Sequence, residues 1–213
     1  MFQHSSSQLP DDKRTENTSN AYYCMVRKNH KQFRTFLLLR LTRMTKTIYL
    51  ARHAKSAWGT AASTDFDRPL SNRGMDDAIR MGKALKSRGW EPEKIFSSPA
   101  HRAQLTCLAY CEYLGFDENL VDWRKEHYAA YMVTLLQCLT SLPESVSSVM
   151  LLGHNPAMED LLVHLCGDLS ECRQKNGKLL TTGNVVKLSL NGAWKELVVS
   201  EAIMVQLLRP KEL

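Results

Sequence analysis

Short apolar segments rich in β-branched residues alternate with longer segments of helical periodicity between residues 46 and 166. A brief apolar run bounded by turn residues is typical of a buried strand, whereas apolar residues three and four apart indicate a helix. The expected strands are 46–51, 94–96 and 148–152, and the expected helices are 71–88, 100–114, 126–142 and 156–166. This alternation favours parallel strands joined by helical crossovers. We therefore predict a three-layer α/β/α sandwich with a mixed, mostly parallel central sheet.

The C-terminal part has a different pattern. Two apolar segments, 185–190 and 194–199, are separated by Asn191-Gly192. An Asn-Gly pair between two such segments is a strong signal for a tight turn between antiparallel strands. The sheet is therefore expected to end in a C-terminal antiparallel hairpin.

The basic charge of the chain is concentrated in its first 43 residues. This segment carries 8 of the 28 Lys and Arg residues but 3 of the 22 Asp and Glu residues, which is a net charge of +5, and the remainder carries +1. A net charge so close to zero gives the remainder no bulk attraction for a nucleic-acid backbone. We therefore expect no nucleic-acid partner.

Residues 1–44 lack the pattern of a folded domain. Residues 1–32 are rich in Ser, Asn, Thr, Gln, Lys and Asp, a composition typical of disorder. The apolar stretch within 33–44 is too short to span a membrane and does not resemble a signal peptide. We interpret residues 1–44 as a disordered or non-native N-terminal extension, with translation starting at Met44 as the favoured reading, and 45–213 as a single domain. No membrane partner is expected.

The cysteines favour a reducing compartment. They are scattered without a C-x-x-C pair, which indicates reduced, mostly buried thiols of a cytoplasmic protein rather than a disulfide or zinc site. No H-E-x-x-H group or Walker A loop is present, so we expect neither a metal nor another cofactor. The cysteines are Cys24, Cys107, Cys111, Cys138, Cys166 and Cys172.

Polar residues interrupt the pattern where the predicted strands end. Arg52 and His53 follow the first strand, Arg102 follows the second after a Ser-Ser-Pro turn, and His154 follows a later strand within Gly-His-Asn. In open α/β sheets, ligands bind at the carboxyl ends of the strands. The two arginines and two histidines are therefore expected to converge on one anionic ligand.

These residue types suit a phosphoryl group. Arginine forks match phosphate oxygens and keep their charge at physiological pH. Two nearby cations also disfavour protonation of an imidazole, so His53 would stay neutral and able to accept a phosphoryl group. Taken singly, His154 is as easily a turn residue and Arg102 a solvated helix residue, and only their joint placement favours a site. The other histidines are interpreted as surface, core or leader residues: His4, His30, His101, His127 and His164.

The motifs together resemble those of the histidine phosphatase superfamily, which includes the phosphoglycerate mutases. The resemblance covers nearly all of residues 45–213. The segments that carry it are Ile48-Tyr49-Leu50-Ala51-Arg52-His53-Ala54-Lys55-Ser56, Asp67-Arg68-Pro69-Leu70-Ser71-Asn72-Arg73-Gly74, Ser97-Ser98-Pro99-Ala100-His101-Arg102, Leu152-Gly153-His154-Asn155-Pro156, Thr181-Thr182-Gly183 and Arg209-Pro210.

The compact spacing between Arg102 and His154 is similar to that of the SixA-type phosphohistidine phosphatases. The resemblance implies that His53 is the phosphorylated nucleophile and that Arg52, Arg102 and His154 form the phosphate pocket. The family's usual glycine after the nucleophile is Ala54 here, as in the SixA-like branch.

In its mutase-like branches the family also has a carboxylic acid, usually after the second helix, that protonates the leaving group. Glu126 is the best positional candidate, and the alternative for it is an exposed residue at a helix N-terminus. Asp67 is a second candidate, and it can equally be a turn residue.

The expected activity is a metal-independent phosphohydrolase with a covalent phosphohistidine intermediate, and the branch suggests phosphohistidine on a protein as its substrate. The expected partner is then a phosphorylated protein such as a histidine phosphotransfer domain, which would place the enzyme in signal transduction. One alternative is a phosphatase or mutase acting on small phosphorylated metabolites. It predicts a covering segment rich in Lys and Arg, for which Lys55, Arg68 and Arg73 are the available residues. A further alternative is a non-catalytic phosphate-binding module.

Overall fold

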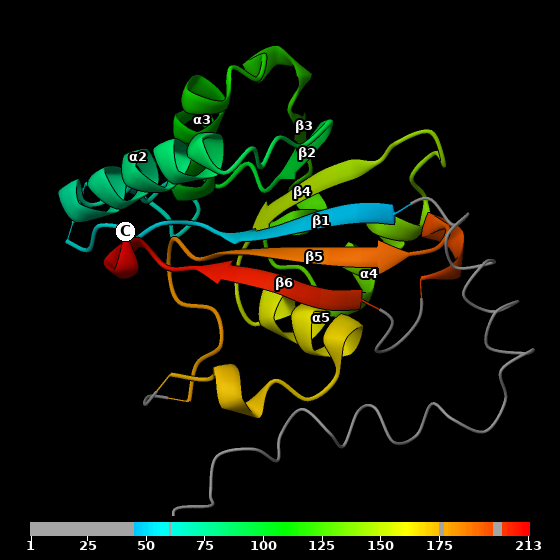
Figure 1. Cartoon of the computed structure of the whole chain (residues 1–213). Coiled ribbons are helices and arrows are strands. Elements are labelled where there is room, and N and C mark those ends of the chain that lie inside the picture. Colours follow the sequence, from blue (N-terminus) through cyan, green and yellow to red (C-terminus); the bar gives the residue numbers. More distant parts are fainter. Residues whose placement is uncertain (1–44, 60, 175–176, 198–201) are drawn as a thin grey trace, which may run out of the picture. The chain divides into compact units, whose positions relative to one another are not determined.

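The computed structural model describes residues 45–59, 61–174, 177–197 and 202–213. These residues form a six-stranded sheet with the strand order β3-β2-β4-β1-β5-β6 (Figure 1). The four strands from β3 to β1 are parallel, and β5 and β6 are antiparallel additions. The strands are β1 (Thr45–Arg52), β2 (Lys94–Ser97), β3 (Asp122–Trp123), β4 (Ser148–Gly153), β5 (Val185–Asn191) and β6 (Ala202–Leu208). The prediction of a mixed, mostly parallel sheet is confirmed. The predicted extension 1–44 lies outside the described residues.

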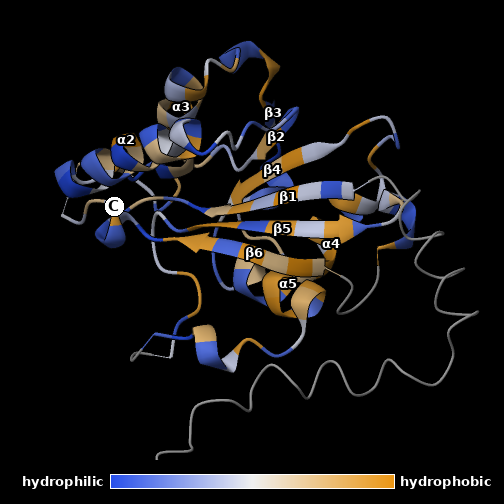
Figure 2. Ribbon diagram, viewed as in Figure 1, coloured by the Kyte–Doolittle hydropathy of each residue, from blue (hydrophilic) through white to orange (hydrophobic). Residues whose placement is uncertain are grey.

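Helices cover both faces of this sheet. One pair is α2 (Asn72–Ser87) and α3 (His101–Leu114), and the other is α4 (Met132–Thr140) and α5 (Ala157–Cys166). Figure 1 shows the two pairs on opposite sides of the strands, which confirms the three-layer arrangement. Figure 2 shows hydrophobic residues along the strands and hydrophilic residues over much of α2, as expected for an outer layer around a buried sheet. None of the helices in the described residues is long and apolar enough to cross a membrane.

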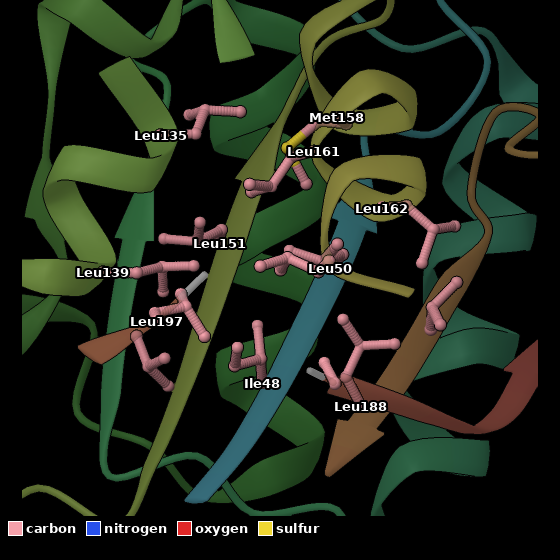
Figure 3. Close-up of a cluster of buried hydrophobic side chains, with 14 of the residues drawn as sticks. Ile48, Leu50, Leu135, Leu139, Leu151, Met158, Leu161, Leu162, Leu188 and Leu197 are labelled. Atoms are coloured by element: carbon pink, nitrogen blue, oxygen red, sulfur yellow. The ribbon is translucent and has the colours of Figure 1, made fainter. Parts of the chain in front are cut away.

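The strand β1 separates two hydrophobic clusters because successive side chains of a strand point to opposite faces. Ile48 and Leu50 pack in the cluster that includes Leu161 of α5, as Figure 3 shows. Tyr49 and Ala51 pack in the cluster on the α2 and α3 side. Both faces of β1 are therefore buried, and its carboxyl end is held firmly between β4 and β5.

The predicted helix 126–142 begins later than expected. Lys125–His127 is a 3-10 turn, the backbone is extended at Tyr131, and α4 begins at Met132. Tyr128 lies in the break, where its hydroxyl group donates a hydrogen bond to Asp65 at 2.9 Å. A tertiary contact thus takes precedence over the local helical pattern, and the prediction was wrong for residues 126–131.

The predicted hairpin also differs in its second strand. Trp194–Glu196 is a 3-10 turn, and the strand that pairs with β5 is β6. The ring of Trp194 is fully buried, and its Nε1 donates to the carbonyl oxygen of Val146 at 2.8 Å. Burial of this large ring turns the chain inward directly after Asn191-Gly192. The antiparallel end of the sheet is confirmed, but the strand predicted at 194–199 was wrong over residues 194–197, and residues 198–199 lie outside the described part of the chain.

Candidate active site

The backbone of the nucleophile candidate is held from three sides. His53 directly follows β1, and its N–H donates to the carbonyl oxygen of Gly153 at 3.1 Å. Gly183 donates to the carbonyl oxygens of Arg52 and His53, at 3.2 and 3.0 Å. The next N–H, of Ala54, donates to Oγ1 of Thr106 in α3 at 3.1 Å. The carboxyl end of β1 is thereby fixed against β4, α3 and the turn before β5.

The turn at Gly183 requires glycine. Its φ is +80°, a left-handed value that other residues rarely adopt, and an added Cβ would lie 2.8 Å from Cγ of Pro210. The Thr-Thr-Gly turn and the terminal Arg-Pro pair, far apart in the sequence, thus pack against each other beside the nucleophile. Their presence among the family-like motifs has a structural reason.

The hydrogen bonds of His53 define its tautomer. Nδ1 lies 2.7 Å from the carbonyl oxygen of Ala54, which can only accept, so Nδ1 carries the proton. Nε2 is then unprotonated, and Nε of Arg102 points its N–H at it from 3.4 Å. The imidazole is buried, with 7% of its surface exposed. The lone pair of Nε2 is therefore the nucleophilic position, and it faces a cation.

Arg102 contacts both histidines that are predicted for the site. It lies in the first turn of α3, and its Nη2 is 3.4 Å from Nδ1 of His154. Because a guanidinium can only donate, Nδ1 of His154 accepts, and Nε2 of His154 donates to Oγ of Ser98 at 2.8 Å. The His53 and His154 rings have centroids 4.8 Å apart. The structure therefore brings His53, Arg102 and His154 together, as the strand-end argument predicts.

Arg52 approaches the same place from β1. Its Nη1 donates to the carbonyl oxygen of Leu180 at 2.7 Å, while its buried Nε has no hydrogen-bond partner within the described part of the chain. Its charge lowers the pKa of both His53 and His154. Arg52 thus adds a second cation whose charge acts on both imidazoles, and its buried Nε–H is unpaired among the described residues.

Burial and charge keep both imidazoles neutral. Desolvation, followed by the charge of His154 and then those of Arg102 and Arg52, lowers the pKa of His53 to about 3, despite an opposing contribution from the Ala54 carbonyl. Desolvation and then the charge of Arg102 lower the pKa of His154 to about 4. Near neutral pH His53 is therefore unprotonated at Nε2 and chemically able to attack phosphorus.

Asp65 is a site residue that the sequence did not indicate. Its carboxylate lies 3.0 Å from Nη2 of Arg102, accepts a hydrogen bond from Tyr128, and pairs with Arg68 at 2.7 Å. Burial raises the pKa of Asp65, but the Tyr128 hydrogen bond and the two arginine charges outweigh it and lower the pKa overall. Tyr128 also places its ring edge-on to His154, with centroids 5.5 Å apart. The acidic Asp65-Phe66-Asp67 turn is the sequence signal for this carboxylate, and from the sequence the candidate role is assigned to Asp67 rather than to Asp65.

The two candidates for the general acid, Glu126 and Asp67, pair with residues outside the cluster of His53, Arg102 and His154. Glu126 is half exposed and its carboxylate pairs with Arg124 at 3.5 Å. Asp67 accepts hydrogen bonds from the hydroxyl groups of Ser63 and Thr64, at 3.2 and 2.6 Å. Within the described residues, neither carboxylate contacts His53, Arg102 or His154. Asp67 has the geometry of a turn residue, and Glu126 that of an exposed residue of a short helical turn.

The sequence profile of the Histidine phosphatase superfamily (branch 1) matches residues 48–128, which include His53 and Arg102. Phosphohistidine phosphatase SixA of Escherichia coli is 30% identical over 122 residues, 56% of this chain and 73% of that protein. A 2,3-bisphosphoglycerate-dependent phosphoglycerate mutase of Methylorubrum populi is 38% identical over 74 residues, covering 34% of this chain and 35% of the mutase.

A solved structure described as the "putative phosphohistidine phosphatase SixA" of Agrobacterium tumefaciens superposes with a TM-score of 0.66 at 30% identity. The match covers 78% of this chain and 98% of that one, so it extends over nearly all of that chain. The chain belongs to the histidine phosphatase superfamily, within which it is similar to the SixA phosphohistidine phosphatases.

Proposed function

We propose that this protein is a phosphatase that forms a covalent intermediate on His53, and that its substrate is phosphohistidine on another protein. The observation that carries the proposal is the state of His53: a buried, neutral imidazole whose unprotonated Nε2 faces Arg102, next to His154. Arg52, Arg102 and His154 are proposed to bind the oxygens of the phosphoryl group. The half-exposed Asp65 lies next to Arg102.

In the first step, Nε2 of His53 forms a bond to phosphorus while the bond from phosphorus to the substrate's nitrogen breaks. The electron pair of that bond leaves with the substrate imidazole, whose other ring nitrogen can take a proton from solvent. Arg102 and Arg52 stabilise the charge on the transferring oxygens, which is the main requirement of phosphoryl transfer. His154 adds a third polar group from the side of β4.

In the second step, the oxygen of a water molecule forms a bond to phosphorus and the bond to Nε2 of His53 breaks. The water loses a proton to solvent, phosphate leaves, and the electron pair returns to Nε2. The low pKa of His53, about 3, makes its unprotonated imidazole a suitable leaving group as well as a nucleophile. The cycle consumes one phosphohistidine and one water.

The positions of the carboxylates support a substrate with a P–N bond. An alkoxide leaving group needs a proton from a nearby acid, and Glu126 faces Arg124 instead of the pocket. Asp65 is close, but its lowered pKa favours the ionised form that cannot donate. An imidazole leaving group needs less help, because its second nitrogen is protonated directly by solvent.

The basic residues near the site also favour this substrate over a small metabolite. Arg68 is paired with Asp65 at 2.7 Å, and Arg73 with Asp77 at 3.6 Å. Lys55 is then the one of the three predicted basic residues without an ion pair among the described residues. A second candidate function is supported by the mutase similarity, namely turnover of small phosphorylated metabolites such as phosphoglycerates.

A phosphoenzyme trap tests the mechanism. The enzyme is mixed with labelled phosphoimidazole, denatured in alkali, and digested to locate the label. We expect an acid-labile, base-stable label on His53 that is absent from His53→Ala and present in the control His164→Ala, in which a histidine of α5 is removed. Absence of label from the wild type would favour a non-catalytic phosphate-binding module, and label that persists in His53→Ala would exclude His53 as the nucleophile.

A comparison of substrates tests the second part of the proposal, which is that the substrate is phosphohistidine on a protein. The value of kcat/KM is measured for a histidine-phosphorylated phosphotransfer domain and for a panel of sugar and glycerate phosphates. We expect faster turnover of the phosphorylated domain. Faster turnover of any glycerate or sugar phosphate would replace the proposed substrate by a metabolite.

A further inference from the structure

Two exposed aromatic rings lie in segments that follow strands of the parallel part of the sheet. Trp58 is 75% exposed and Tyr131 is 79% exposed, and they are the two aromatic members of the exposed large hydrophobic residues in the described part of the chain. Trp58 follows β1, and Tyr131 follows β3, so both lie in segments that leave the carboxyl ends of parallel strands. Of the aliphatic members, Val133 follows Tyr131 in α4, whereas Leu120 lies just before β3 and Ile203 lies on the edge strand β6.

The indole of Trp58 is held in place although it faces water. The guanidinium of Arg68 stacks on it, with the central carbon 3.9 Å from the ring centroid. Arg68 is itself fixed, since its side chain is 15% exposed and donates to the carbonyl oxygen of Ala57 at 3.3 Å. An exposed indole whose orientation is already fixed loses little conformational entropy when it binds a partner. Residues of this kind are frequent at the centres of protein interfaces.

Direct contacts connect this indole to the phosphate pocket. Arg68 pairs with one oxygen of Asp65, and the other oxygen of Asp65 contacts Arg102 and the hydroxyl group of Tyr128. Tyr131 lies three residues after Tyr128, at the start of α4. Asp65 and Tyr128 therefore link the segments that carry the two exposed rings to Arg102.

We propose that Trp58 and Tyr131 form a docking surface for a folded protein that presents its phosphorylated side chain to the pocket. The charge pattern supports this occupant: Arg52 and Arg102 suit a dianionic phosphoryl group, and the exposed Lys55, three residues after Arg52, can pair with an acidic residue beside it. A small metabolite bound at Arg102 would leave the rings of Trp58 and Tyr131, which are 75% and 79% exposed, in contact with water. The inference rests on the proposed function and names the surface that recognises its substrate.

The test compares two substrates that share the same chemistry. The values of kcat and KM are measured for a histidine-phosphorylated phosphotransfer domain and for phosphoimidazole, with Trp58→Ala, Tyr131→Ala and the matched control Leu120→Ala. Leu120 is also 68% exposed, but it lies at the amino end of β3, away from the site. We expect Trp58→Ala to lower kcat/KM about tenfold for the protein, through KM, and to change it less than about twofold for phosphoimidazole.

The other outcomes are equally informative. Equal losses on both substrates would show that Trp58 only supports Arg68 and the pocket, and no loss on the protein would show that the surface is unused. A wild-type dimer that Trp58→Ala dissociates would identify a second copy of the chain as the occupant. Any of these results overturns the proposal. Formation of phospho-His53 is followed in parallel, because its absence from the wild type marks failure of the proposed function, whereas label without an effect of Trp58→Ala marks failure of the docking surface alone.

Discussion

The buried histidines predict a strong dependence of stability on pH. Burial lowers the pKa of His127 to about 4, and burial with neighbouring charges lowers those of His154 to about 4 and His53 to about 3. In the unfolded chain each returns to its ordinary value of about 6.5. The unfolded state therefore binds more protons as the pH falls below 6.5, and the folded state loses stability in that window until its own histidines protonate.

The magnitude follows from these pKa values. Between pH 7.5 and pH 5.0, each histidine that stays neutral when folded lowers the free energy of unfolding by about 2 kcal/mol, or about 6 kcal/mol for the three. That is a large part of the roughly 5–15 kcal/mol that stabilises a typical domain. The pKa values of Asp65 and Glu159 are also lowered, so these carboxylates add to the loss mainly at pH values below this window.

Urea unfolding at the two pH values measures this loss, and His127→Leu isolates one contribution. His127 is 2% exposed, and its Nδ1 has no hydrogen-bond partner among the described residues. We expect the difference in unfolding free energy between pH 7.5 and 5.0 to shrink by about 2 kcal/mol in the variant, whatever its absolute stability. A wild-type difference under about 2 kcal/mol, or an unchanged difference in His127→Leu, would refute the reasoning.

Arg102→Lys should lower kcat/KM for phosphoimidazole by about 10²-fold or more, because an ammonium group cannot reproduce the fork that contacts His53, Asp65 and His154; a loss below about fivefold would contradict this role. Glu126→Gln should leave kcat within about twofold of the wild type, since Glu126 pairs with Arg124 outside the pocket, and a large loss would restore it as the acid. Asp65→Asn should lower KM severalfold, because the ionised carboxylate competes with the phosphoryl group for Arg102; steady-state kinetics showing a raised KM would refute that competition. Gly74→Ala should lower the free energy of unfolding by about 1–3 kcal/mol in urea titrations, because a Cβ there would overlap the carbonyl oxygen of Lys55, and an unchanged midpoint would show that this contact can relax.

Most of the fold could be predicted because its signals are local. The strands near 46–51, 94–96 and 148–152 and the helices that begin near Ser71 and Ala100 follow from short-range periodicity and turn residues. The strand β3 has two residues, which is too short to produce a pattern. The start of α4 and the path after Asn191 were mispredicted because they depend on contacts with residues far away in the sequence, from Tyr128 to Asp65 and from Trp194 to Val146.

The part of the site that follows predicted strands could also be predicted from the sequence. His53, Arg102 and His154 converge because each follows a strand of the parallel part, and the sheet itself brings strand ends together. Asp65 and Tyr128 reach the pocket through irregular segments whose paths no periodicity encodes. Their pairing depends on where two long turns meet in space, which one sequence does not reveal.

The position of His53 at the end of a strand paired on both sides has a consequence for local unfolding. To release the nucleophile, the chain must break hydrogen bonds to both β4 and β5, so such openings require nearly the full free energy of unfolding. Amide protons of Ile48 and Leu50 should therefore be among the slowest to exchange, while those around Trp58 exchange early. Substitutions in the segment around Trp58 can thus change which substrates bind without destabilising the strand that positions His53.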